Sequence, residues 1–74
     1  MLAKARFNQI VATNLRKVRE DKGIAQDKLS VECGFFRTYV SLVENCRKSP
    51  SGYSLYRLAK GLGVSVDELF PKTV

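Results

Sequence analysis

Residues 32 to 48 of the chain read ECGFFRTYVSLVENCRK, and this stretch decides the fold that we expect. Two phenylalanines follow Gly34 directly, and Val40 and Val43 then recur at the spacing of a helix. A glycine at such a place separates one helical segment from the next. The apolar side chains therefore predict an anchor in the core, which holds residues 37 to 39 out toward a partner.

The composition limits what a chain of this size can be. With 74 residues, of which 45% are hydrophobic, we expect one globular domain over residues 1 to 74, without room for a deep catalytic cleft. No apolar run approaches the length of a membrane span, and the N-terminus leads into no signal-peptide core. The expected location is therefore the cytoplasm, and no membrane partner is expected.

The charge balance is basic. Thirteen lysines and arginines face seven aspartates and glutamates, which gives a formal net charge of +6. This surplus favours a polyanionic partner, because the neutralisation of phosphates releases counterions. A surface charge that only keeps the protein soluble is the competing interpretation.

The residues of the commonest metal and nucleophile chemistry are missing from the sequence. The chain has no histidine and only two cysteines, Cys33 and Cys46. Two thiols do not complete a tetrahedral zinc site, and without histidine neither a Ser–His nor a Cys–His pair can form. We therefore expect no enzyme activity, no metal, no cofactor and no small-molecule ligand, and we interpret both cysteines as inert thiols.

The first helix is predicted over residues 7 to 22. Apolar residues recur there at steps of three and four and form one stripe, and Gly23 supplies a stop. The stripe comprises Phe7, Ile10, Val11, Leu15 and Val18, and the basic residues beside it, which we expect to be solvated, are Arg16, Lys17, Arg19 and Lys22.

Two shorter helices are predicted next, the second helix over residues 26 to 33 and the third from Phe36 to about Asn45. The connection between them contains Gly34 and is only three or four residues long. That length and chemistry are typical of a helix-turn-helix, in which two helices cross steeply. The sequence thus predicts a helix-turn-helix over about residues 26 to 45.

The C-terminal part, about residues 52 to 70, predicts two further helices. Ser51 can cap the fourth helix, and Ser65 and Glu68 have the spacing of a capping box at the start of a fifth, which Pro71 stops. We therefore expect a compact all-α fold of five helices without strands. The inner face of the fourth helix is expected to comprise Leu55, Leu58, Ala59 and Leu62.

An ordered set of residues runs from the first loop to the C-terminal end. It reads Gly23-x-x-Gln26-x-x-Leu29, then Gly34, then Arg37-Thr38-Tyr39-Val40-Ser41-x-Val43-Glu44-Asn45, and finally Leu55-x-x-Leu58-Ala59-x-x-Leu62-Gly63-Val64-x-x-Asp67-Glu68-Leu69-Phe70. Over about residues 7 to 70 the chain resembles the lambda-repressor-like, xenobiotic-response-element family of helix-turn-helix regulators. The central run looks most like the controller proteins of restriction–modification systems.

The resemblance implies how the domain meets DNA. In this family the second helix lies across the backbone and the third enters the major groove. Arg37 is then the main candidate for base readout, because a guanidinium can pair with guanine O6 and N7. A surface salt bridge to Glu32 or Glu44 is its competing role. The other candidates for base readout are Thr38 and Ser41, for which exposed filler is the alternative, and Arg47.

Four further residues are expected to contact the DNA backbone. Gln26 stands at the start of the second helix, where its amide can meet a phosphate. Lys48 follows the third helix, Asn45 ends it, and Tyr39 is expected to be partly buried with its hydroxyl at the edge. Phe36 leaves two alternatives open, because its ring can touch a thymine methyl or fold back onto the protein.

The sequence departs from the family pattern at several positions. Phe36 and Ala25 stand where small polar residues usually cap helices, and Ser30 replaces a small apolar alanine. Cys46 stands where the family usually has glycine. For that reason we expect Asn45 to end the third helix in a left-handed conformation.

A homodimer is expected, because one recognition helix reads too few base pairs for a useful site. The expected interface is the C-terminal part, whose apolar residues exceed what a small core can hide. Burial in the core, or exposure as isolated apolar residues, is the alternative. The interface candidates are Tyr53, Tyr56, Val64, Val66 and Phe70.

These observations predict a sequence-specific transcriptional regulator that binds a two-fold symmetric site in double-stranded DNA. A restriction–modification controller is the first interpretation, a phage or plasmid repressor of the Cro kind is the second, and an antitoxin is the third. From a different class, a protein-interaction module could use its basic face to bind an acidic partner or RNA polymerase.

Overall fold

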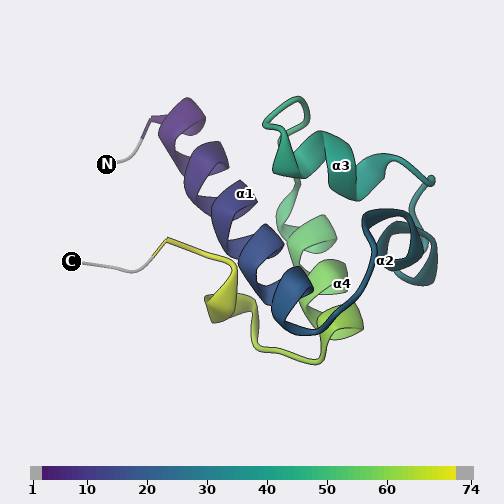
Figure 1. The fold of residues 1–74 in the computed structure, drawn as a ribbon. Coiled ribbons are helices and arrows are strands. Elements are labelled where there is room, and N and C mark those ends of the chain that lie inside the picture. The colour runs from purple at the N-terminus through teal and green to yellow at the C-terminus, as the bar shows by residue number, and fades with distance from the viewer. Residues whose placement is uncertain (1–2, 72–74) are drawn as a thin grey trace.

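The computed structural model describes residues 3–71, which form four α-helices and one short 3-10 turn. The elements are α1 (Lys4–Asp21), α2 (Gln26–Glu32), α3 (Tyr39–Glu44), α4 (Gly52–Leu62) and the turn η1 (Val66–Glu68). Figure 1 shows α2 and α3 to one side of α1 and η1 to the other. The all-α helix-turn-helix fold is confirmed, except that the fifth helix is only a 3-10 turn.

Helix α1 is longer at its start than the stripe predicted, since it begins at Lys4 rather than at residue 7. It ends at Asp21, and Gly23 then turns the chain with a φ of +69°. This left-handed conformation is favourable for glycine, which has no β-carbon. The stop predicted at Gly23 is therefore confirmed.

The turn between α2 and α3 consumes more of the chain than predicted. Helix α2 ends at Glu32, Gly34 has a φ of +85°, and α3 begins only at Tyr39 instead of at Phe36. The Tyr39 N–H donates to the Phe36 carbonyl at 3.0 Å, which makes a tight turn ahead of the helix. Because Phe36 offers no side-chain acceptor, no local cap starts the helix earlier.

The end of α3 corrects the prediction for Asn45. Asn45 has a φ of −96°, and Cys46 takes the left-handed conformation instead, with a φ of +60°. The Arg47 N–H donates to the Leu42 carbonyl at 2.8 Å and the Cys46 N–H to the Val43 carbonyl at 3.1 Å. These two bonds form a Schellman motif, which places the left-handed residue one position beyond the cap.

The two C-terminal caps differ in outcome. Ser51 caps α4 as predicted, because its Oγ accepts from the Ser54 N–H at 3.0 Å. Ser65 Oγ accepts from the Asp67 N–H at 3.1 Å, whereas the Glu68 N–H donates to the Ser65 backbone carbonyl. The predicted capping box is therefore wrong, since a single 3-10 turn is too short to carry its geometry.

Apolar residues from every element meet in one core. The inner face predicted for α4 is buried, and so are Val11 and Leu15 of the α1 stripe, whereas Phe7, Ile10 and Val18 are only half-buried. The helices are amphipathic, and none within residues 3–71 is both long and apolar enough to cross a membrane. The core comprises Val11, Leu15, Leu29, Cys33, Tyr39, Val40, Val43, Leu55, Leu58, Ala59, Leu62 and Leu69.

Gly61 allows α4 to pack closely on α2, and its replacement tests this contact. A β-carbon at Gly61 would clash with Cys33 Sγ and would lie 3.5 Å from Leu29 Cδ1. We expect Gly61→Ala to lower the free energy of unfolding by about 1–3 kcal/mol, because overpacking a core displaces side chains or backbone. Urea denaturation followed by circular dichroism measures the change.

Gly52, the first residue of the same helix, provides the matched control. A β-carbon at Gly52 would meet nothing within 4 Å, so Gly52→Ala should be neutral or stabilising by up to about 1 kcal/mol. Adding Cys33→Ala to Gly61→Ala removes the clashing sulfur and should cost less than the two single changes together. Equal stability of the two alanine variants at Gly61 and Gly52 would refute the close packing.

Candidate nucleic-acid interface

The carboxylate of Glu44, at the end of α3, is fully buried and joins three helices. Arg19 of α1 donates to it twice, from Nε to Oε2 at 2.7 Å and from Nη2 to Oε1 at 3.0 Å. Gln26 of α2 donates from Nε2 to Oε1 at 2.8 Å, and Arg16 of α1 donates from Nε at 3.3 Å. Each helix of the helix-turn-helix is thus tied to α1 through one side chain.

The two arginines were predicted to be solvated, and for Arg19 this is wrong. Its side chain is only 11% exposed, and its Nη1 also donates to the Ile24 carbonyl at 2.9 Å. Arg16 keeps 47% of its side chain exposed. The signal that could have found the pair was a glutamate in the third helix with no apolar face to share, opposite basic residues of the first helix.

The environment of Glu44 has opposing effects on its ionisation. Burial raises the pKa of the Glu44 carboxyl, because it penalises the charged form. The hydrogen bonds from Arg19, Gln26 and Arg16, together with the charge of Arg19, outweigh burial and hold the pKa of Glu44 below its usual value. The carboxylate is therefore charged at neutral pH and fully compensated.

A shallow groove lies where the starts of α2 and α3 meet, and it brings together four predicted DNA contacts. Its volume is about 430 Å³. Sequence analysis did not single out Asp27, which also lines the groove, and Ala25 was noted only as a missing cap. The complete lining is Ala25, Gln26, Asp27, Arg37, Thr38 and Ser41.

Arg37 lies in the turn ahead of α3 with 77% of its side chain exposed. Its salt-bridge partner is neither Glu32 nor Glu44, the two that were predicted. It is Asp27, whose Oδ2 lies 3.5 Å from Arg37 Nη2 and whose side chain is 52% exposed. Such an exposed pair contributes little to stability, so the guanidinium is free to leave it for another acceptor.

The remaining polar candidates lie outside the groove, around the end of α3. Asn45 is exposed and donates from Nδ2 to Ser41 Oγ at 3.4 Å. Arg47 and Lys48 are exposed in the loop that follows. A hydrogen bond of 3.0 Å from Ser49 Oγ to Asn8 Oδ1 ties this loop to the start of α1.

The aromatic residues at the start of α3 are more deeply involved in the core than predicted. Tyr39 is only 3% exposed, stacked on the Phe35 ring with centroids 4.1 Å apart. Phe36 packs its edge on the Tyr39 ring at 5.6 Å yet remains 54% exposed. Tyr39 is therefore a core residue that can offer DNA no more than its hydroxyl, and Phe36 combines both of its predicted roles in part.

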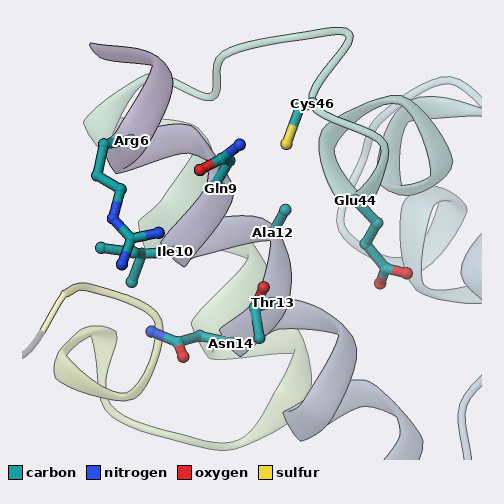
Figure 2. A pocket seen from close by; sticks show the side chains of 8 residues that line it. All are labelled: Arg6, Gln9, Ile10, Ala12, Thr13, Asn14, Glu44 and Cys46. Carbon is teal, nitrogen blue, oxygen red and sulfur yellow. The ribbon is translucent and has the colours of Figure 1, made fainter. Parts of the chain in front are cut away.

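A second groove, of about 500 Å³, separates α1 from the end of α3 (Figure 2). The Glu44 side chain points away from the other lining residues, and Asn14 is engaged elsewhere, with its Nδ2 3.2 Å from the carbonyls of Leu69 and Phe70. The groove contains none of the predicted DNA contacts. Its lining is Arg6, Gln9, Ile10, Ala12, Thr13, Asn14, Glu44 and Cys46.

The predicted dimer residues do not form one continuous surface. Tyr53 and Tyr56 are 68% and 49% exposed on the outer face of α4. A groove of about 310 Å³ beside them is lined by Tyr56, Ala59, Lys60, Val64, Ser65 and Val66. Phe70 instead packs on Phe7 of α1, with ring centroids 6.0 Å apart.

The short paired helices, with an exposed arginine and hydroxyls where they meet, define a small helix-turn-helix domain. The chain belongs to the helix-turn-helix family HTH_3, whose model matches residues 15–69. It is 37% identical over 67 residues to an uncharacterized HTH-type transcriptional regulator, y4dJ, from Sinorhizobium fredii. That match covers 90% of this chain and 87% of the relative.

Solved structures show the same similarity. The hypothetical transcription factor NHTF from Neisseria has a TM-score of 0.84 at 33% identity, covering 96% of this chain and 83% of that one. The restriction–modification controller protein C.AhdI from Aeromonas hydrophila has a TM-score of 0.81 at 32% identity, covering 85% of this chain and 96% of that one. The resemblance to controller proteins is therefore confirmed over most of the chain.

The buried Glu44 carboxylate should make stability depend on pH. A carboxyl whose pKa is lowered by folding stabilises the protein above the pKa of the unfolded state, about 4.3 for glutamate, and this contribution is lost as the pH falls further. We expect Glu44→Gln to be less stable at pH 7 by about 3 kcal/mol and to lose less stability than the native chain between pH 5 and acidic pH. Urea denaturation at a series of pH values measures both effects.

Glu20 is the control, because its carboxylate lies 3.9 Å from Arg19 Nη2 but its side chain is 63% exposed. Glu20→Gln should leave the stability and its pH dependence almost unchanged. An acid limb of the same steepness in Glu44→Gln and in the native chain would contradict the role of the buried carboxylate.

Proposed function

We propose that the chain is a transcriptional regulator that binds a two-fold symmetric DNA site as a homodimer. The observation that carries this proposal is the groove where Gln26, Arg37, Thr38 and Ser41 meet at the starts of α2 and α3. The net charge of +6 and membership of the helix-turn-helix family support it. Phosphate attraction supplies affinity, and the groove residues supply selectivity.

Base readout is assigned to the exposed groups at the start of α3. Arg37 is held only by a weak surface pair, so it can exchange Asp27 for a guanine edge, to which a guanidinium binds with two hydrogen bonds. The Thr38 and Ser41 hydroxyls line the same groove and are short enough to allow close approach of the helix. Arg47, in the loop after α3, is the remaining readout candidate, and the exposed part of Phe36 is available to a thymine methyl.

Backbone contacts are assigned to the two flanks of this face. Gln26 donates one amide hydrogen to Glu44, which leaves its second hydrogen for a phosphate. Asn45 and Lys48 are exposed at the opposite end of α3. The contribution of Tyr39 is limited to its hydroxyl, since the ring is buried.

A dimer follows from the length of the recognition helix. Helix α3 has six residues, about 9 Å of helix, so one copy can contact only a few base pairs. The exposed aromatic face of α4 and the groove beside it offer apolar surface for a second copy, through Tyr53, Tyr56, Val64 and Val66, with Phe70 at the margin. Two copies would then present their α3 helices to half-sites about one helical turn apart.

The regulated genes are proposed to be a restriction–modification operon, because the chain is similar over most of its length to a controller protein. A regulator without a sensor domain responds to its own concentration through dimerisation. A phage or plasmid repressor uses the same geometry, and an adjacent methyltransferase or endonuclease gene would distinguish the controller from it.

Arg37→Ala tests base readout. Selection from a random duplex library should recover a two-fold symmetric site for the native chain, and the variant should lose binding to it. Loss of one bidentate arginine contact in each half-site removes about 1–3 kcal/mol of discrimination per contact. Titration by fluorescence anisotropy measures the affinities, and circular dichroism checks that the variant folds.

Asp27→Ala is the matched control, because it breaks the same surface pair and keeps the guanidinium. It should bind the selected site as tightly as the native chain or more tightly. If the two variants lose binding equally, the pair itself matters and the readout role is wrong. If the native chain selects no site and binds only in a salt-dependent manner, the proposed function fails.

Tyr56→Asp tests the dimer surface. A charge introduced into the apolar groove beside α4 should shift the protein to monomers and weaken binding to the paired half-sites, because an unpaired charge is costly to bury. Sedimentation velocity measures the oligomeric state. Val31→Asp, at a residue that is 60% exposed on α2, should leave it unchanged, and an unaltered dimer in Tyr56→Asp would place the interface elsewhere.

A further inference from the structure

Helix α3 starts without a cap of its own. Thr38, at the cap position, has φ −93° and ψ 6° and makes no side-chain hydrogen bond to the helix. Phe36 has no polar side-chain atom to offer. Val40, the second helical residue, is 0% exposed, so water cannot satisfy its N–H, and a buried donor without a partner is costly.

The acceptor for this N–H comes from the neighbouring helix. Ser30 of α2 is 0% exposed, and its Oγ accepts from the Val40 N–H at 2.9 Å. The same hydroxyl donates to the Gln26 carbonyl at 2.9 Å, one turn back along α2. Its single hydrogen is thereby committed, and an alanine at position 30 would supply neither bond.

A second tie joins the same two helices at the other end of α3. Gln26 Nε2 donates to Glu44 Oε1 at 2.8 Å, so Gln26 serves the first tie with its backbone carbonyl and the second with its side chain. Helix α3 has only six residues. The two ties therefore hold both its beginning and its end against α2.

We propose that Ser30 is a positioning residue for DNA recognition, which caps α3 from α2 and sets the angle at which the groove residues meet the bases. This inference rests on the proposed function. Hydrogen bonds to base edges weaken steeply with misalignment, whereas attraction to phosphates depends mainly on charge. Loss of the Ser30 hydroxyl should therefore weaken specific binding more than non-specific binding.

The test compares Ser30→Ala with the native chain on two duplexes, the site recovered by selection and a scrambled sequence of the same length. We expect affinity for the selected site to fall about tenfold or more, the consequence of one buried donor left unsatisfied. Affinity for the scrambled duplex should stay within about twofold. Without DNA, hydrogen exchange of the Val40 amide should accelerate relative to the amides of α1, as measured by NMR.

Ser51→Ala is the matched control, because it also removes a serine that caps a helix, α4, but one outside the helix-turn-helix. It should reduce stability without changing the ratio of the two affinities. If Ser30→Ala does not fold, Ser30→Cys keeps the size of the side chain with a weaker acceptor, and it should accelerate Val40 exchange and lower the same ratio to a smaller extent.

Two outcomes would overturn the inference. One is an equal loss of affinity for both duplexes, which would make Ser30 a core residue without influence on readout. The other is unchanged protection of the Val40 amide in the variant that folds. Failure of the native chain to select any site would instead contradict the proposed function, and the exchange experiment would still decide whether Ser30 caps α3.

Discussion

The rest of the structure depends on one buried charge. The Glu44 carboxylate has no access to solvent, and a buried charge is tolerated only when it is paired and hydrogen-bonded. Its partners Arg19, Arg16 and Gln26 come from two other helices. No one of α1, α2 and α3 can shift relative to the others without leaving a buried charge or amide unpaired, so their arrangement is fixed more sharply than apolar packing alone would fix it.

This constraint matters because the helix it holds is short. Helix α3 has six residues, and an isolated helix of that length is not stable in water. It is held on its inner side by Tyr39, Val40 and Val43. At its end Cys46 accepts a left-handed backbone conformation, which costs about 1–2 kcal/mol for a residue with a β-carbon and allows the Schellman bonds that satisfy the last carbonyls.

The polar groove and the aromatic surface belong to different elements. The groove lies at the starts of α2 and α3, whereas Tyr53 and Tyr56 lie on α4, beside the groove that includes Val64 and Val66. DNA and a second copy of the chain therefore need not compete for the same residues. Cys33, in contrast, has no part in either surface, because it is 3% exposed and its burial raises the pKa of its thiol.

The sequence by itself determined the four helices, the glycine turns and the apolar faces, because these depend on the spacing of neighbouring residues. It also indicated that Gln26, Arg37, Thr38 and Ser41 belong together, since they stand at the starts of two consecutive helices. The extent of the last helix was not predicted, because a single turn carries too little periodic signal.

What only the tertiary structure decided are the contacts between residues distant in the chain. Arg19 looked solvated until α3 brought Glu44 against it, and Phe70 looked available for a dimer until it met Phe7. Ser30 looked like a departure from a family pattern until its hydroxyl was seen to cap α3. Periodicity records which side of a helix faces inward, but the partner of a polar group is set by distances between helices, which no local pattern contains.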